Sequence, residues 1–211
     1  MGVFIAIEGI ECAGKTTQIQ RVAHALHERG YHTLIAREPG GSEIGEHIRS
    51  VLKDPAHRDR MHALTSLFLF NASRKQFVEE VVKPALARDN IVIADRFVLS
   101  TLAYQGHAEG LPLDFVRSVC LHTAGDCMPR KTYLLDISVR EMKRRLAART
   151  LLGEDRYDHM DMSFHEKVRT GYLAEWEKDK AHIERVDGEG EEREITERLL
   201  QKIMPLLSSL V

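Results

Sequence analysis

Short apolar runs alternate along the chain with longer segments that have the hydrophobic periodicity of helices. Several of the short runs contain no polar residue, which is typical of strands covered on both faces of a parallel sheet. Five strands are predicted, at Val3–Ile7, Thr33–Ala36, Ile91–Ala94, Tyr133–Leu135 and Ile183–Val186. Helices are predicted between and after them, at Lys15–Arg29, Glu43–Lys53, Met61–Arg88, Leu113–Ala124, Val139–Arg149, Ser163–Lys180 and Glu192–Leu207. This alternation favours an α/β fold with a five-stranded parallel sheet and helices on both faces.

The third predicted helix is unusually long and contains Pro84. Proline removes a backbone donor and clashes with the preceding turn, so we expect a kink or a restart there. We find no internal repeat and no low-complexity linker, and the 211 residues suit one domain spanning residues 1–211.

The overall charge is nearly balanced, at a formal value of -2, which argues against a nucleic-acid or membrane-surface binder. Three cysteines form neither a disulfide framework nor a zinc-binding spacing. The first apolar run ends at Glu8 and is too short for a membrane span. We therefore expect a cytoplasmic protein. Local basic clusters could still bind small anions, so the charge balance leaves the substrate open.

The segment Gly9–Thr16 matches the phosphate-binding pattern G-x-x-x-x-G-K-[ST], between a predicted strand and a predicted helix. The two glycines permit a tight turn whose N–H groups point at phosphate oxygens, and the helix adds the positive end of its dipole. Lys15 is expected to reach the β- and γ-phosphates of ATP, and the Thr16 hydroxyl to ligate Mg²⁺. The residues expected around the phosphates are Gly9, Ile10, Glu11, Cys12, Ala13, Gly14, Lys15, Thr16 and Thr17.

A second candidate, Asp95-Arg96, directly follows the third strand. Ligands collect at the carboxyl ends of parallel strands. Asp95 could hold the magnesium shell or orient an acceptor, and Arg96 could clamp an acceptor phosphate; equally, Asp95 could simply cap a turn.

Several motifs together resemble the thymidylate kinases. They are the phosphate loop, Arg37-Glu38-Pro39-Gly40-Gly41, Phe70-Asn71-Ala72-Ser73-Arg74, Asp95-Arg96-Phe97, Ser100 to Gly106, and Arg149 to Tyr157. The resemblance implies a P-loop NTPase fold with a small mobile lid over about residues 149–162. It also implies phosphorylation of dTMP to dTDP by ATP with Mg²⁺, and a homodimer. The sequence departs from many relatives at Cys12 and Phe97, neither of which removes a required group.

The resemblance also implies roles for single residues on the acceptor side. Phe70 would stack on thymine, although it could also be helix core, and Arg74 would donate to a pyrimidine carbonyl. Arg37 and Arg96 would hold the dTMP phosphate, and Glu11 would accept the sugar 3′-hydroxyl. The residues that fall where the family contacts base and sugar are Ser100, Thr101, Tyr104 and Gln105.

On the ATP side, the resemblance implies that Arg149 packs on adenine. Arg156 would reach the transferring phosphoryl group from the lid, because the phosphate loop itself carries no arginine. The catalytic set is then Lys15, Asp95 and Arg156, with Thr16 and Asp95 as the metal residues. Three alternatives remain: a kinase for UMP, dCMP or a nucleoside, a P-loop switch or partitioning ATPase, and a degenerate nucleotide-binding module.

Overall fold

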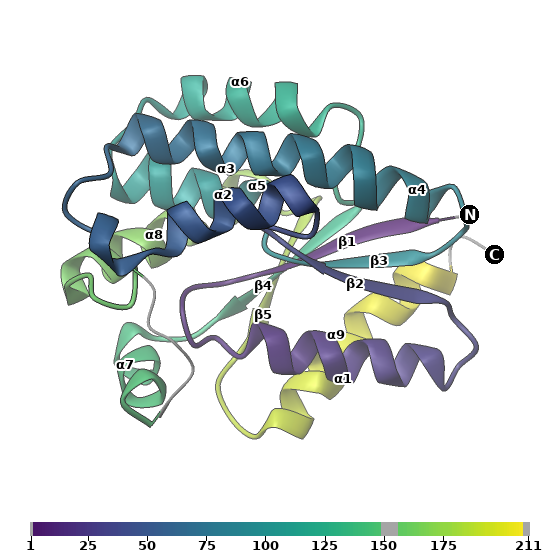
Figure 1. Cartoon of the computed structure of the whole chain (residues 1–211). Helices are drawn as coiled ribbons and strands as arrows, with labels where there is room; N and C mark the ends of the chain where they lie inside the picture. The colour runs from purple at the N-terminus through teal and green to yellow at the C-terminus, as the bar shows by residue number, and fades with distance from the viewer. Residues whose placement is uncertain (1, 149–155, 209–211) are drawn as a thin grey trace.

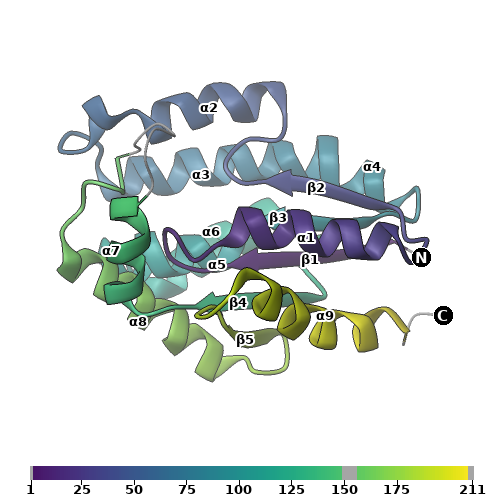
Figure 2. The same ribbon diagram turned by 90° about the horizontal axis from the view of Figure 1, so that it is seen from below.

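The five predicted strands form one parallel sheet in the computed structural model, which describes residues 2–148 and 156–208. The order across the sheet is β2-β3-β1-β4-β5 (Figures 1 and 2). Each strand runs one residue further toward its carboxyl end than predicted, and that residue is charged in all five. The strands are β1 (Val3–Glu8), β2 (Thr33–Arg37), β3 (Ile91–Asp95), β4 (Lys131–Asp136) and β5 (Ile183–Asp187).

Helices cover both faces of this sheet, with α1 and α9 on one face and α3 and α6 on the other (Figure 1). The predicted α/β architecture is therefore confirmed. The α-helices are α1 (Lys15–His27), α2 (Glu43–Lys53), α3 (Ala63–Phe77), α4 (Lys83–Leu86), α5 (Val98–Thr101), α6 (Leu113–Ala124), α7 (Val139–Ala148), α8 (Met162–Lys178) and α9 (Glu192–Ser208). A 3₁₀ turn η1 (Pro55–His57) and two π-helical segments, η2 (Val78–Val82) and η3 (Leu102–Ala108), join them.

The central strand β1 shows why both faces of the sheet are apolar. Ile5 and Ile7 pack into one core with residues of α1, α8 and α9, whereas Phe4 and Ala6 pack into a second core with residues of α3 and α6. Alternate side chains of a strand point to opposite faces, so an unbroken apolar run serves both cores.

The long third helix differs from its prediction in two ways. It begins at Ala63, and it widens into the π-helical η2 immediately before α4, where Pro84 is the second residue. The backbone N–H of Lys83 donates to the Val78 carbonyl oxygen, five residues earlier. The wider turn lets the chain pass a proline that lacks an N–H of its own, so the helix continues instead of breaking.

Residues 98–108 also form helix, as α5 and η3, a stretch for which the sequence predicted no helix. Among the described residues, no helix combines the length and apolar character that crossing a membrane requires.

Candidate active site

The loop between β1 and α1 folds around the side chain of Lys15. Gly9 has a φ of 150°, and a Cβ there would lie 2.5 Å from the carbonyl oxygen of Leu135, so no larger residue fits. Gly14, with a φ of 89°, immediately precedes α1. Lys15 Nζ donates to the carbonyl oxygens of Gly9 at 3.0 Å and Ile10 at 2.8 Å. An ammonium group and a helix N-terminus therefore meet at one point, as phosphate binding requires.

Lys15 is buried, with 8% of its surface exposed. Burial and the nearby guanidinium of Arg96 lower the pKa of Lys15 to about 8, against the opposing attraction of Asp95 and Glu11. The protein without ligand thus holds a desolvated cation whose charge a bound phosphate would stabilise.

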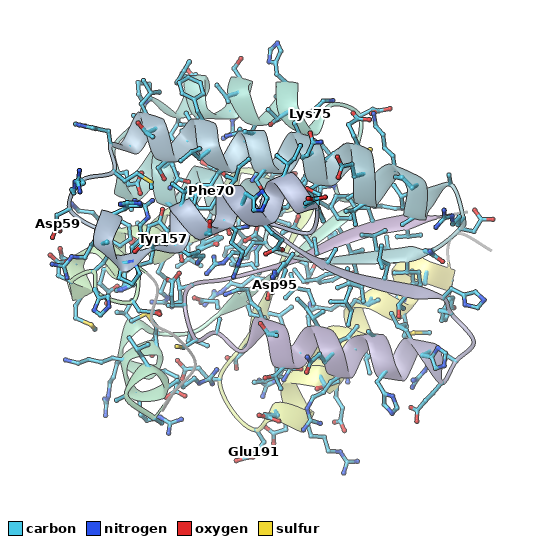
Figure 3. All side chains as sticks on the ribbon, viewed as in Figure 1. Asp59, Phe70, Lys75, Asp95, Tyr157 and Glu191 are labelled. Atoms are coloured by element: carbon cyan, nitrogen blue, oxygen red, sulfur yellow. The ribbon has the colours of Figure 1, made fainter. Side chains whose placement is uncertain are left out.

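Thr16 and Asp95 bring two oxygen donors together beside this loop. Thr16 Oγ1 donates to Asp95 Oδ2 at 2.8 Å. Asp95 is the last residue of β3 and pairs in register with Ile7 of β1 (Figure 3). Its carboxylate therefore lies at the edge of the sheet where β1 ends and the phosphate loop begins. Hydroxyl and carboxylate oxygens are ligands that Mg²⁺ prefers. The two oxygen donors therefore fit a magnesium ion beside the phosphate loop.

Arg96 connects the phosphate loop to the rest of the site. Its backbone has a φ of 73°, a conformation that a non-glycine residue adopts rarely and at a cost. Nη1 donates to the Gly9 carbonyl oxygen at 3.0 Å, and Nη2 donates to Glu11 Oε1 at 3.0 Å. Nη1 also donates to the hydroxyls of Ser100 at 3.1 Å and Tyr172 at 3.0 Å. These contacts fix the guanidinium in one orientation.

Glu11 is held by the same group of residues. The Tyr104 hydroxyl lies 2.6 Å from each carboxylate oxygen of Glu11. Burial acts to raise the pKa of Glu11, but Arg96, together with His165 and Lys15, outweighs it and lowers this pKa well below its usual range. Glu11 is therefore a charged acceptor inside the site.

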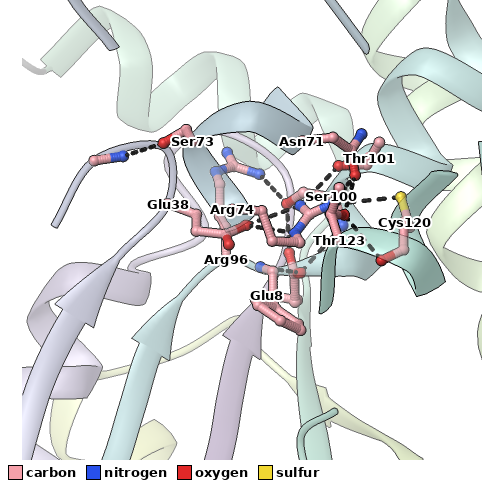
Figure 4. A network of polar contacts seen from close by, with 12 residues as sticks. Glu8, Glu38, Asn71, Ser73, Arg74, Arg96, Ser100, Thr101, Cys120 and Thr123 are labelled. Carbon is pink, nitrogen blue, oxygen red and sulfur yellow. Dashed lines mark hydrogen bonds and ion pairs between the residues drawn. The ribbon is translucent and has the colours of Figure 1, made fainter. Parts of the chain in front are cut away.

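Glu8, at the carboxyl end of β1, supports this arrangement from behind (Figure 4). Its carboxylate accepts hydrogen bonds from the backbone N–H groups of Phe97 at 2.7 Å and Ser100 at 3.1 Å. Both groups lie at the start of α5, where a backbone N–H has no acceptor within the helix itself. It also accepts from the hydroxyls of Ser100 and Tyr172. Burial raises the pKa of Glu8. The residue ties β1 to the segment that carries Arg96.

Two cavities meet at this group of residues. The larger, of about 840 Å³, opens over the phosphate loop, and the second is narrow and runs toward α3 and η3. Both are lined by Glu11, Glu38, Lys53 and Arg96. The narrow cavity is further lined by Pro39, Phe70, Arg74, Phe97, Ser100, Thr101, Tyr104, Gln105 and Tyr157.

Arg74 lies in the wall of the narrow cavity, with its guanidinium held by buried partners (Figure 4). Nε donates to Glu38 Oε2 at 2.9 Å, and Nη2 lies 2.8 Å from the same oxygen. Nη1 donates to Asn71 Oδ1 at 3.1 Å, and Nη2 to Thr101 Oγ1 at 2.9 Å. Burial raises the pKa of Glu38, against the attraction of Arg74. This network fixes Arg74 before any ligand arrives.

Comparison with known proteins identifies the family. The Thymidylate kinase family model matches residues 7–199. The thymidylate kinase of Syntrophotalea carbinolica is 41% identical over 203 residues, covering 94% of both chains, and that of Geotalea daltonii is 44% identical over 193 residues, covering 89% of this chain and 90% of its own. The chain belongs to the thymidylate kinase family. A crystal structure of thymidylate kinase from Ehrlichia chaffeensis aligns with a TM-score of 0.78 at 26% identity, covering 96% of this chain and 98% of that one.

The family resemblance and the P-loop NTPase fold expected from the sequence are therefore confirmed. The residues predicted to bind the acceptor of a thymidylate kinase all line the two cavities. Arg37 lies at the larger cavity, with its guanidinium 2.9 Å from Glu46 Oε2, and the others line the narrow one. On the phosphate side, the larger cavity is lined by Glu11, Cys12, Gly14, Lys15, Thr16, Thr17 and Asp95.

The structure does not bring Arg156 to the phosphate loop. Its Nη2 donates to Ser66 Oγ at 2.8 Å and to the Tyr157 hydroxyl, and its guanidinium stacks 4.4 Å from the Tyr157 ring centre. Glu109 Oε1 lies 3.8 Å from Arg156 Nη2. Arg149 and the first half of the predicted lid, residues 149–155, lie outside the described residues.

Four further cations line the large cavity of this thymidylate kinase family member, and sequence reasoning missed them. Arg49 and Lys53 lie on α2, and Arg144 and Arg145 lie on α7. Arg145 Nη1 donates to the Cys12 carbonyl oxygen at 3.3 Å, so it touches the phosphate loop directly. The spacing of Arg49 and Lys53, four residues apart on a helix that follows the Arg37 loop, was the available signal.

Proposed function

We propose that the enzyme transfers the γ-phosphoryl group of ATP to dTMP, giving ADP and dTDP, with the two nucleotides bound in the two connected cavities. The observation that carries this proposal is the position of Arg96, which lines both cavities and donates to the phosphate loop at two points, the Gly9 carbonyl oxygen and the Glu11 carboxylate. An arginine in that place can hold an acceptor phosphate next to the γ-phosphate of ATP.

On the ATP side, the backbone N–H groups of the phosphate loop and the ammonium group of Lys15 bind the phosphates. Thr16 and Asp95 would hold Mg²⁺, which when bound neutralises charge on the phosphate oxygens. Arg145, which touches the loop at Cys12, adds a further cation near the polyphosphate.

On the acceptor side, Arg37 and Arg96 hold the dTMP phosphate. One of its oxygens attacks the γ-phosphorus as the bond from that phosphorus to the β–γ bridging oxygen breaks, and ADP leaves with the electron pair. The acceptor phosphate is already ionised near neutral pH, so no general base is needed. Asp95 therefore positions groups and does not remove a proton.

The narrow cavity takes the nucleoside. Phe70 stacks on the thymine ring, and Arg74 donates to a ring carbonyl, which an amino group at the same position of cytosine could not accept. The Arg74 guanidinium donates to protein groups in the structure, so this role requires one of those hydrogen bonds to be exchanged for the bond to the base. Glu11 accepts the sugar 3′-hydroxyl. The remaining contacts to base and sugar come from Ser100, Thr101, Tyr104 and Gln105.

Arg156 acts on the transferring phosphoryl group from the lid side in this proposal, the arrangement that the sequence resemblance implies for bacterial enzymes. Its guanidinium contacts Ser66 and Tyr157 in the structure, so the role requires Arg156 to leave these partners when both nucleotides bind. Lid closure would also exclude water from the γ-phosphate.

We also propose that the enzyme is a cytoplasmic homodimer. Phe68 of α3 and Phe115 of α6 are 51% and 43% exposed, and their rings form an edge-to-face pair with centres 6.5 Å apart. An exposed aromatic pair beside exposed Leu64 supports an interface on this helix face. Sedimentation of Phe68→Glu should give a monomer where the parent chain gives a dimer; an unchanged sedimentation coefficient would exclude this face.

The reaction is tested by supplying ATP and Mg²⁺ with dTMP, dUMP, UMP, dCMP or thymidine and separating the products by chromatography. We expect dTDP from dTMP at the highest rate, and at least about a hundredfold loss of that rate in Arg96→Ala. ADP release that does not depend on any acceptor would instead identify an ATPase.

A further inference from the structure

His165 is a buried histidine beside the phosphate loop to which the proposed reaction assigns no task. It lies near the start of α8, and 1% of its surface is exposed. Nδ1 lies 3.6 Å from Glu11 Oε2, slightly beyond hydrogen-bond length. Neither ring nitrogen has a hydrogen-bond partner among the described residues.

Such a residue is unfavourable for folding alone. A buried ring nitrogen that stays beyond hydrogen-bond length from its nearest acceptor recovers only part of the hydration it loses, so an apolar side chain of similar size would be at least as stable here. An apolar side chain would also find packing here, because the ring of Phe164 lies edge-to-face with the His165 ring, with centres 5.8 Å apart. A histidine in this place therefore points to a use in binding or catalysis.

The contact with Glu11 indicates what that use is. The other groups on this carboxylate are Arg96 at Oε1 and the Tyr104 hydroxyl, so His165 is the group that faces Oε2 from α8. With its proton on Nδ1, the ring directs an N–H at Oε2 through a water-poor interior, where such an attraction is strong. A shift of less than about 1 Å would bring the pair to hydrogen-bond length.

We propose that His165 is a positioning residue that holds Glu11 in the orientation that accepts the nucleoside sugar. The three partners of Glu11 then approach it from α8, from η3 and from the segment after β3, which restricts rotation of the carboxylate. This inference rests on the proposed role of Glu11 toward the 3′-hydroxyl of dTMP, and it predicts an effect on acceptor binding that ATP binding does not share.

Two substitutions separate positioning from packing. His165→Leu removes both nitrogens with little change in volume, whereas His165→Asn keeps an N–H donor near the place of Nδ1. We expect His165→Leu to raise the KM for dTMP about five- to tenfold, with kcat and the KM for ATP within about twofold. Its Tm should stay equal or rise, because an unpartnered polar group is lost. His165→Asn should recover most of the affinity for dTMP.

Val168→Ala, at a buried apolar position of the same helix, is the matched control. It should lower Tm through lost packing and leave the KM for dTMP unchanged. A purely structural role for His165 predicts the same behaviour for His165→Leu, and that result would overturn the proposal.

The link through Glu11 is tested with Glu11→Gln, the double variant and 3′-deoxy-dTMP as acceptor. The penalty of His165→Leu should disappear in the Glu11→Gln background and with the 3′-deoxy substrate. An undiminished penalty in both would overturn the positioning role while leaving that of Glu11 intact. If Glu11→Gln still distinguishes dTMP from its 3′-deoxy analogue as strongly as the parent enzyme does, the role of Glu11 fails, and this inference with it. Absence of dTDP formation by the parent enzyme would instead refute the proposed reaction.

Discussion

Raising the pH above about 8 is expected to weaken ATP binding, because it removes the proton from Lys15 in the free enzyme. Burial and the guanidinium of Arg96 lower the pKa of this lysine to about 8 from its ordinary value of 10.5. The neutral amine does not attract phosphate, so kcat/KM for ATP should fall tenfold for each pH unit above that pKa.

The size of the effect follows from the two pKa values. The difference between 10.5 and about 8 corresponds to about 3 kcal/mol, at ~1.4 kcal/mol for each tenfold change in proton affinity. The free enzyme bears this cost to keep a buried ammonium charged at neutral pH, and the phosphates of ATP offset it on binding. The pKa of Lys15 should therefore be higher in the ATP complex, and the alkaline fall in kcat at saturating ATP should occur at higher pH than the fall in kcat/KM.

The assay measures initial rates from about pH 7 to 9.5 at saturating dTMP, with ATP varied at each pH, and fits kcat and kcat/KM separately. Lys15→Arg is the control, because arginine stays charged across this range; its affinity for labelled ATP, measured by equilibrium dialysis, should be independent of pH. A flat kcat/KM profile for the parent enzyme, or an unchanged alkaline fall in Lys15→Arg, would refute this role of Lys15.

Three further substitutions test separate parts of the site. Asp95→Asn should raise the Mg²⁺ concentration for half-maximal rate about tenfold, and an unchanged requirement would exclude Asp95 from the metal shell. Arg156→Ala should lower kcat roughly a hundredfold with little change in the KM for dTMP; a normal kcat would show that Arg156 does not reach the transferring group. Glu8→Ala removes the acceptor of the hydrogen bonds from Phe97, Ser100 and Tyr172, and should lower the free energy of unfolding in urea by about 3 kcal/mol. A loss below about 1 kcal/mol would contradict its bracing role.

The central strands β1 and β3 could be predicted closely because a strand buried on both faces has a short unbroken apolar run, which loops and surface helices rarely contain. The helix over residues 98–108 could not, because its residues from Leu102 to Gly106 are all buried and no polar face marks a helical period. The π-helical segment before Pro84 could not be predicted either, because sequence periodicity does not distinguish a widened helical turn from a regular one.

The site was predictable where the chemistry lies in neighbouring residues. The phosphate loop and Asp95-Arg96 can each be recognised within a few positions, and the structure brings them together through the register of β1 and β3. Supporting residues such as Glu8, His165 and Tyr172 carry no such pattern. They come from β1 and α8, and only the packing of α8 against η3 reveals which carboxylate or hydroxyl each of them faces.

Transfer of a labelled γ-phosphoryl group tests the proposed reaction most directly. The enzyme is incubated with Mg²⁺, dTMP and ATP labelled at the γ-phosphorus, and the labelled products are separated over time. We expect label to leave ATP only when dTMP is present and to appear in the β position of dTDP. Label released as inorganic phosphate at the same rate with and without dTMP would contradict phosphoryl transfer to dTMP.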